Sequence, residues 1–276
     1  MVDVAGGLAS LGIESVSASQ ISQYLRCPRQ WAMRKVLGLK MRPGAAAIAG
    51  SGLHAAAEAG MLGKIRSGED PKPDESAEIA HDFVCGKAEN EEVDIDEPGG
   101  VGAVATRAAR FAEEWAKRAS PMVEPESVEH TEQMEVAGVT LNGRFDVIDR
   151  RGWVVDWKTS SRRVSPATPL SSIQTEVYSL LAGRRVSYFY LVDGPLGVSL
   201  DVITQTESAR QESERLAVST VAEASRGMAL GVWPRNRNGW HCSKKWCGYY
   251  DRCMSGQDDA RLKELADAAR RTALGA

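Results

Sequence analysis

The sequence predicts a mixed α and β protein, of the α/β or α+β class, in which helices flank one central mixed sheet. The periodicity of the apolar residues is the main indication. It is helical up to about residue 118, two-residue between 127 and 159, and then follows a helix–strand–strand–helix order. The second indication is size. With 276 residues, of which 43% are hydrophobic, the chain can form one large domain or one domain with an insertion.

The first 120 residues are expected to be mainly helical. Residues 1–16 are expected to form a loose arm. The glycines of the segment 50–52 stand where a helix could begin close to another backbone, which would place His54 in its first turn. Residues 65–120 are interpreted as a helical insertion, interrupted at the Gly- and Pro-containing segment 96–100.

The middle of the chain has the alternation of a sheet. A first turn is expected at Ala137-Gly138, and a helix over 170–183 is expected to separate the first three strands from the last two. A long helix over about 206–229 and a final charged helix around 257–273 follow. The strands are predicted over 127–136, 139–149, 153–159, 186–192 and 198–204.

The composition limits the environment and the partners of the protein. No stretch reaches the roughly 18 apolar residues that a membrane span needs, and the N-terminus lacks the basic and apolar regions of a signal peptide. These features predict a soluble, cytoplasmic protein without a membrane partner. Because the net charge is −3, any surface that binds nucleic acid must be a local positive patch.

One hairpin carries the main functional signal. Asp156 and Lys158 are two residues apart in a predicted strand, so both side chains project from the same face. If residues 150–152 form a three-residue loop, Gly152 supplies the left-handed residue that such a loop requires, and Asp149 pairs with Trp153. In that register Asp146 lies opposite Asp156.

Two opposed carboxylates repel each other unless a cation lies between them. A hard divalent ion such as Mg²⁺ or Mn²⁺ accepts oxygen ligands and would resolve the repulsion. Lys158 could then orient or deprotonate the attacking water, or stabilise charge on a phosphate oxygen. The alternative is a set of exposed charges on a solvent face, which is the commoner explanation of an arbitrary Asp-x-Lys. The strongly apolar hairpin favours the catalytic interpretation.

The hairpin also resembles a known family. Gly143-Arg144-Phe145-Asp146 and Asp156-Trp157-Lys158 resemble two motifs of the PD-(D/E)XK nuclease superfamily, and the RecB-like branch, with its CRISPR-adaptation and phage recombination exonucleases, is most similar. Three further segments are similar to motifs of that branch and occur in its order. They are the helix motif from Ser17 to Cys27-Pro28, the Gly-x-x-x-His element that ends at His54, and Gln174-x-x-x-Tyr178.

The resemblance implies a restriction-endonuclease-like core in a single nuclease domain over residues 1–276, and an Mg²⁺- or Mn²⁺-dependent deoxyribonuclease. It implies that His54, Asp146 and Asp156 bind the metal, with the Trp157 carbonyl as an extra ligand. Lys158 is then the catalytic lysine, and Gln174 and Tyr178 position the substrate or the lysine.

The cysteines suggest a second metal site. Cys242, Cys247 and Cys253 lie within twelve residues, and an odd count of five in a chain without an export signal argues against disulfides. With Cys27 they make four thiolates, which suits either zinc or a [4Fe–4S] cluster. Some RecB-like members hold such a cluster with one N-terminal and three C-terminal cysteines. The first gap here is four residues rather than two, so zinc stays open. The bound metal is expected to link Cys27 to segment 242–253 and so to form a metal-cluster clip between the two ends of the chain. Cys85 is expected to be a buried small hydrophobic residue.

The resemblance favours an exonuclease that acts on DNA with free ends or on single strands, in recombination, repair or phage DNA processing. Its setting would be a bacterial or phage-infected cell, with a helicase or recombination protein as a partner. Two alternatives remain. One is a structure-specific endonuclease, and the other is a non-catalytic DNA-binding protein that keeps the fold and the cluster.

Overall fold

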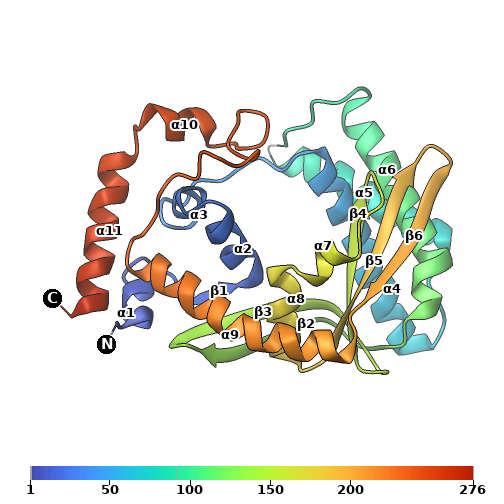
Figure 1. Ribbon diagram of the computed structural model, residues 1–276. Helices are drawn as coiled ribbons and strands as arrows, with labels where there is room; N and C mark the ends of the chain where they lie inside the picture. The colour runs from blue at the N-terminus through green and yellow to red at the C-terminus, as the bar shows by residue number, and fades with distance from the viewer. Residues whose placement is uncertain (1, 92, 276) are drawn as a thin grey trace. The chain divides into compact units, whose positions relative to one another are not determined.

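The structure is a computed structural model that describes residues 2–91 and 93–275 (Figure 1). The chain forms two compact units, each assembled from segments that are far apart in the sequence. Unit 1 comprises Met1–Met41, Glu132–Gly143 and Glu212–Ala276, and unit 2 comprises Arg42–Thr131 and Arg144–Gln211. The predicted fold class, a mixed sheet flanked by helices, is confirmed.

The sheet contains six strands within the described residues. β3 (Val139–Asp149) and β4 (Trp153–Ser160) are antiparallel, β4 and β5 (Arg185–Gly194) are parallel, and β5 and β6 (Gly197–Thr204) are again antiparallel. β2 (Pro125–Val136) pairs with β3. The predicted strands agree with these five to within two residues. The parallel pair needs a crossover, which α7 (Ala167–Leu170) and α8 (Ile173–Ala182) provide.

A helical layer covers one face of the sheet in unit 2 (Figure 1). It consists of α4 (Ala45–Ser67), α5 (Pro73–Asn90) and α6 (Gly100–Glu114), followed by the short helices η1 (Trp115–Ala119) and η2 (Ser120–Met122). Trp157 is buried between this layer and the sheet, with its ring 5.6 Å from that of Trp115 and 5.2 Å from that of Phe189. The helices predicted within 65–120 are therefore present, and they form part of the main core.

The predicted helix start at residues 50–52 is wrong, because α4 begins at Ala45 and His54 lies in its third turn. Close packing explains why glycine stands there. A Cβ atom on Gly52 would lie 2.9 Å from the Ala80 carbonyl oxygen and 3.0 Å from the Ala108 Cβ. Gly52 therefore lets α4 approach α5 and α6.

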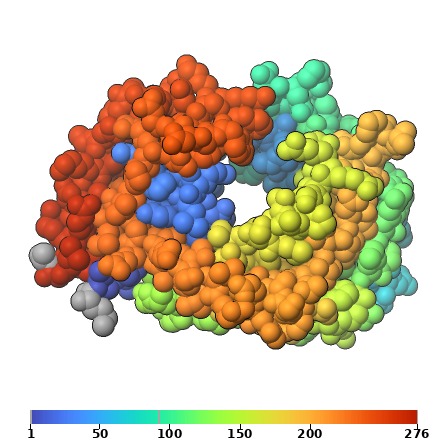
Figure 2. Space-filling model, viewed as in Figure 1, coloured from blue at the N-terminus to red at the C-terminus, as the bar shows by residue number. Residues whose placement is uncertain are grey.

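Unit 1 combines the two ends of the described chain. The N-terminal part forms α1 (Val4–Ala9), β1 (Ser15–Ser17), α2 (Ala18–Arg26) and α3 (Pro28–Lys35). The C-terminal part forms most of α9 (Glu207–Ala229), then α10 (Tyr250–Ser255) and α11 (Asp259–Leu274). Figure 2 shows the blue N-terminal residues against the orange and red C-terminal ones.

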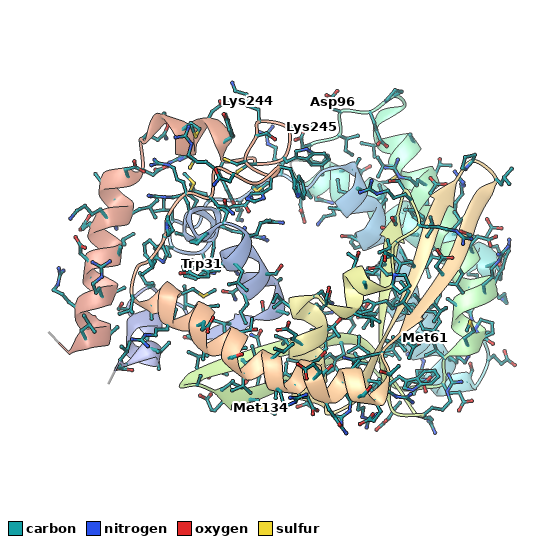
Figure 3. All side chains as sticks on the ribbon, in the orientation of Figure 1. Trp31, Met61, Asp96, Met134, Lys244 and Lys245 are labelled. Carbon is teal, nitrogen blue, oxygen red and sulfur yellow. The ribbon has the colours of Figure 1, made fainter. Side chains whose placement is uncertain are left out.

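The expectation of a loose N-terminal arm is wrong. The Asp3 side chain caps α1, which packs against α11, and β1 runs parallel to the Thr140–Asn142 part of β3. Trp31 is fully buried in this unit (Figure 3), with its ring 5.7 Å from that of Tyr24 and 6.1 Å from that of Trp233. Long-range contacts of this kind give the N-terminal segment its order. None of the helices in the described residues is long and apolar enough to span a membrane.

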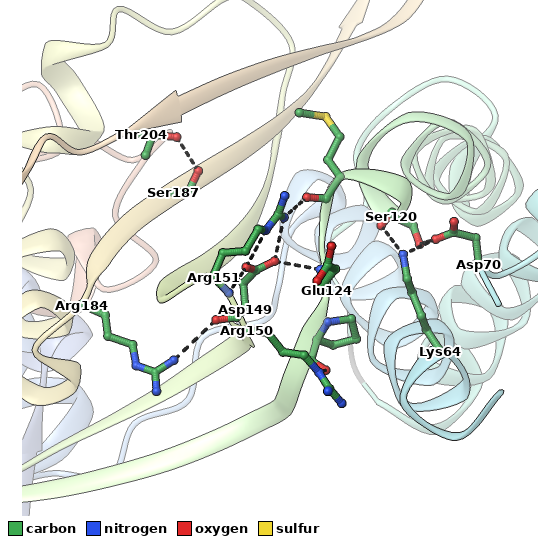
Figure 4. A network of polar contacts seen from close by, with 12 residues as sticks. Lys64, Asp70, Ser120, Glu124, Asp149, Arg150, Arg151, Arg184, Ser187 and Thr204 are labelled. Atoms are coloured by element: carbon green, nitrogen blue, oxygen red, sulfur yellow. Dashed lines mark hydrogen bonds and ion pairs between the residues drawn. The ribbon is translucent and has the colours of Figure 1, made fainter. Parts of the chain in front are cut away.

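The β3–β4 turn has the predicted geometry. Gly152 has a φ of +88°, its N–H donates to the Asp149 carbonyl, and Asp149 pairs with Trp153. The buried Asp149 carboxylate accepts hydrogen bonds from the Arg151 backbone at 2.7 Å, from the Arg151 guanidinium at 2.9 Å and from the Glu124 N–H at 2.8 Å (Figure 4). Burial alone would raise the pKa of Asp149, but these hydrogen bonds and the Arg151 charge hold it below its usual value.

We expect Asp149→Asn to lower the free energy of unfolding by about 2 kcal/mol at pH 7, because charged hydrogen bonds in a buried site are lost. Since the folded pKa is depressed, the stabilisation is fully present above the unfolded pKa of about 3.9 and is lost as the pH falls through the folded value. Urea unfolding followed by tryptophan fluorescence measures the difference. The control Asp82→Asn alters a carboxylate that is 73% exposed and should change little. A difference that is independent of pH would contradict this account.

Candidate active site

Asp146 lies where the β3–β4 ladder stops. The paired residues run from Asp149 and Trp153 to Val147 and Val155, as the predicted register requires. At the next position Asp146 does not continue the ladder. Its Oδ2 accepts a hydrogen bond from the Trp157 backbone N–H at 2.8 Å, which leaves Oδ1 for another partner. The carboxylate is thereby fixed to β4.

Asp156 and Lys158 form a largely buried ion pair on the β4 face opposite Trp157. The Lys158 Nζ lies 2.6 Å from the Asp156 Oδ2, and Asp156 is 2% exposed. Gln174 Nε2 donates to the Asp156 Oδ1 at 2.5 Å. Burial and the nearby charge of Asp146 raise the pKa of Asp156 to about 6, against the opposing effects of Lys158 and His54. Burial would lower the pKa of Lys158, but the charges of Asp156 and Asp146 raise it above its usual value. Lys158 is therefore a cation at neutral pH.

α8 supports both strands of the site. It begins at Ser172, whose hydroxyl caps the Thr175 N–H and directs Gln174 to Asp156. One turn later, the Tyr178 hydroxyl donates to the Arg144 carbonyl at 2.7 Å, and burial raises the pKa of Tyr178, so it stays a neutral phenol. Gln174 and Tyr178 thus contact Asp156 and the β3 backbone. Their contact with a substrate stays a prediction.

A group suited to a metal ion lies next to these residues. His54 on α4 places its Nδ1 3.4 Å from the Asp146 Oδ1. One ligand atom each from His54, Glu129 and Asp146 lies within 4.8 Å of the other two, and no other such group occurs in residues 2–91 and 93–275. Opposite ligands of an octahedral ion with bonds of about 2.1 Å are about 4.2 Å apart, so the nitrogen and carboxylate donors fit a divalent cation with little movement.

Of the metal ligands that the resemblance implies, only some lie close together in the structure. It brings His54 and Asp146 together, whereas the Asp156 oxygens do not belong to the group of three within 4.8 Å. Asp156 is joined to the site through its neighbour Trp157, which donates to Asp146. The roles of Asp156 and of the Trp157 carbonyl as metal ligands stay predictions.

Glu129 is a site residue that the sequence did not reveal. It lies in β2, a strand with several glutamates, and belongs to no recognisable motif. Its φ is +52°, a conformation that non-glycine residues rarely adopt and that costs about 1 kcal/mol. Burial and the charges of Asp146 and Glu58 raise the pKa of Glu129, while Arg144 opposes the rise.

The protonation of His54 depends on the same carboxylates. Burial lowers its pKa, but the hydrogen bond to Asp146 and the charges of Asp146 and Asp156 outweigh burial and raise it above the usual value. A proton therefore competes with a metal ion for the Nδ1 lone pair.

Four cysteines line one cavity in unit 1. They are Cys27 at the start of α3 and Cys242, Cys247 and Cys253 near α10. Burial and the neighbouring thiols raise the pKa of Cys247. No three of the sulfurs lie within 4.8 Å of one another in the described part of the chain. Cys85 is on α5 in unit 2 and packs against its core.

Residues 15–254 match the family model of the PD-(D/E)XK nuclease superfamily. The chain belongs to this superfamily. The match includes the β3–β4 hairpin, α8 and all five cysteines. Membership in the PD-(D/E)XK nucleases implies a metal-dependent nuclease with DNA as its substrate, and the His54–Glu129–Asp146 group is consistent with a metal requirement.

Two solved structures are similar to this chain. A protein from Eubacterium rectale, provisionally named an exonuclease, is 13% identical, with a TM-score of 0.57 over 86% of this chain and 89% of its own. The protein SSO0001 is 14% identical, with a TM-score of 0.42 over 90% of this chain and 93% of its own. No curated protein matches the chain. At 13% identity, the likeness to the Eubacterium rectale structure shows the fold alone.

Proposed function

We propose that the protein is a DNA exonuclease of the RecB-like branch, dependent on Mg²⁺ or Mn²⁺, with residues 1–276 as one nuclease domain. The observation that carries the proposal is the Asp156–Lys158 pair, buried next to Asp146 and His54. An ion pair that involves a buried aspartate is costly to maintain. It has a clear use where negative charge develops on a phosphate.

The residues of the site have separate tasks in the proposed hydrolysis of phosphodiester bonds. A bound divalent ion would polarise the phosphate and supply an activated water. His54, Asp146 and Asp156 would hold the ion, with the Trp157 carbonyl as an additional donor. Lys158 stays protonated because the charges of its carboxylate neighbours raise its pKa, and it stabilises charge on the phosphate oxygens. Gln174 keeps the Asp156 carboxylate oriented, and Tyr178 holds β3 at Arg144.

We also propose that Cys27, Cys242, Cys247 and Cys253 bind a [4Fe–4S] cluster. Two observations support it. The four thiols line one cavity, and partial burial together with the neighbouring thiols raises the pKa of Cys247, which a bound cation would offset. Tetrahedral zinc, with Zn–S bonds of about 2.3 Å, holds its sulfurs about 3.8 Å apart. No three of the four sulfurs lie within 4.8 Å of one another among the described residues, so a zinc site would need the cysteines to move closer together; zinc remains the alternative.

Action on DNA ends or single strands, in recombination, repair or phage DNA processing, follows from the family branch, as does a helicase or recombination protein as partner. A structure-specific endonuclease and a non-catalytic DNA-binding protein are the competing functions. Lys158→Ala distinguishes the last of these, because a protein that only binds DNA should keep its function without a catalytic lysine.

The test is degradation of end-labelled linear DNA with Mn²⁺, with closed circular single-stranded DNA in parallel. We expect the wild type to release short products from linear DNA and to leave the circle intact, because an exonuclease needs an end. Asp156→Ala should release at most about a hundredth as much product. The matched control Asp82→Ala removes an exposed carboxylate from the same unit and should keep full activity. Equal degradation by the wild type and Asp156→Ala would contradict the proposed site, and cleavage of the circle would favour the endonuclease.

A further inference from the structure

Glu129 and Arg144 form an ion pair at the edge of the metal-binding group. Arg144 Nε contacts the Glu129 carboxylate, and the two side chains differ in exposure, with Glu129 18% exposed and Arg144 62% exposed. Both residues line a cavity together with His54, Glu58 and Asp146. The pair is therefore accessible from the space into which His54 and Asp146 project.

The ion pair and the metal-binding group share the Glu129 carboxylate. One Glu129 oxygen lies within 4.8 Å of the His54 and Asp146 ligand atoms, and the same carboxylate contacts Arg144. A guanidinium and a divalent ion would both be attracted to it, and the ion carries the larger charge. A carboxylate with two lone-pair-bearing oxygens can leave the first partner for the second through a small side-chain rotation.

The surrounding backbone is fixed, so that only side chains need to move. The Tyr178 hydroxyl holds the Arg144 carbonyl. Arg144 and Asp146 are two residues apart on β3 and share a face. Glu129 has a left-handed backbone conformation, with a φ of +52°, and its carboxylate lies beside His54, Asp146 and Arg144.

We propose that Glu129 is a further protein ligand of the active-site metal, beside His54 and Asp146, and that Arg144, its partner in this structure, is released to a phosphate of the DNA when Glu129 turns to the metal. The proposal rests on the metal-dependent nuclease function proposed above. It adds an anionic ligand from β2 and a phosphate-binding arginine from β3. Because one carboxylate serves both cations in turn, metal binding prepares the site for DNA.

Metal affinity tests the ligand assignment without reference to activity. Titration with Mn²⁺, followed by the loss of the electron paramagnetic resonance signal of the free ion, gives Kd for each variant. We expect Glu129→Gln to raise the Mn²⁺ Kd at least about tenfold, because a charged ligand is lost. The matched control Glu126→Gln removes the same charge from the same strand, at an exposed pair with Arg184, and should shift Kd by less than about twofold. Similar Kd values for the two variants would overturn the ligand assignment.

Arg144→Gln is expected to have the opposite effect on the metal. Removal of a competing cation should lower the Mn²⁺ Kd by about threefold or more. The same variant should bind a short DNA duplex at least about fivefold more weakly in Ca²⁺, because a guanidinium contact to a phosphate is lost. A purely structural ion pair would give weaker metal binding for both Glu129→Gln and Arg144→Gln. That outcome, or unchanged metal binding by Arg144→Gln, would overturn the exchange of partners.

Asp146→Asn separates failure of this inference from failure of the proposed function. If Asp146→Asn weakens Mn²⁺ binding and Glu129→Gln does not, the metal site stands and Glu129 is not a ligand. If neither variant changes the Mn²⁺ Kd, the proposed metal site itself is wrong. Unfolding curves for all four variants confirm that each is folded.

Discussion

Lys158→Ala is expected to lower the rate of DNA hydrolysis about a thousandfold or more at saturating Mn²⁺. The lysine is a cation held 2.6 Å from the Asp156 carboxylate, and among the described residues no other cationic side chain forms an ion pair with Asp156. Its removal takes away positive charge where the transition state gains negative charge. Since Lys158 is not a metal ligand, the Mn²⁺ Kd should change far less than kcat, and single-turnover hydrolysis combined with the Mn²⁺ titration measures both.

Lys158→Arg distinguishes the two tasks that a lysine can have at this position. Arginine keeps the charge but cannot act as a base. The carboxylate neighbours raise the pKa of Lys158, so the group remains protonated throughout the neutral range. Stabilisation of charge predicts at least about tenfold more activity for Lys158→Arg than for Lys158→Ala, and no break in the wild-type pH–rate profile from Lys158 near neutrality. Equal activities for the two variants would indicate general base catalysis instead.

Cys27→Ala is expected to have the largest effect on stability. A metal clip from Cys27 to Cys242 would close a loop of more than 200 residues, which the chain-entropy model values at about 5 kcal/mol. For a chain of this size that corresponds to a fall of about 10 °C or more in the unfolding midpoint. The variant should also lose bound metal, since one of four thiolates is missing. Metal analysis of an anaerobic preparation and a thermal scan measure the two effects.

Cys85→Ala is the matched control within the same chain. Cys85 lies on α5 in unit 2 and is not among the residues that line the cavity of the other four cysteines. It should retain the full metal content and unfold within a few degrees of the wild type. Brown protein with about four iron atoms per chain supports the cluster. Stoichiometric zinc in a colourless preparation would support the alternative, and metal loss from both variants alike would contradict a specific site at the four cysteines.

The β3–β4 hairpin could be predicted from the sequence because short-range rules determine it. A three-residue loop with Gly152 in the left-handed conformation sets the pairing of Asp149 with Trp153, and the two-residue period of the strands sets the rest. The same count predicted Asp146 opposite Asp156, but the ladder ends at Val147 and Val155, and the Asp146 side chain instead accepts a hydrogen bond from the Trp157 N–H. The other strands were predicted closely for a similar reason, since their alternation reflects burial on one face.

Features that depend on long-range packing could not be predicted in this way. Gly52 permits the approach of α5 and α6 to α4, and a sequence alone does not distinguish that use from a helix boundary. α1 is ordered by contact with α11, more than 240 residues later in the chain. Glu129 reaches the site through an unusual backbone conformation in a strand with many glutamates. None of these leaves a local pattern.

The alternation along β4 has a consequence for how this protein can evolve. Val155 and Trp157 face the helical layer and contribute to stability, whereas Asp156 and Lys158 face the candidate active site. Substitutions on one face leave the packing of the other largely intact. A descendant could therefore lose hydrolysis by a change at Asp156 or Lys158 and still inherit the fold, free to acquire a different use. In this strand, the residues that maintain the fold alternate with the residues proposed to carry the activity, so the two properties can change independently in evolution.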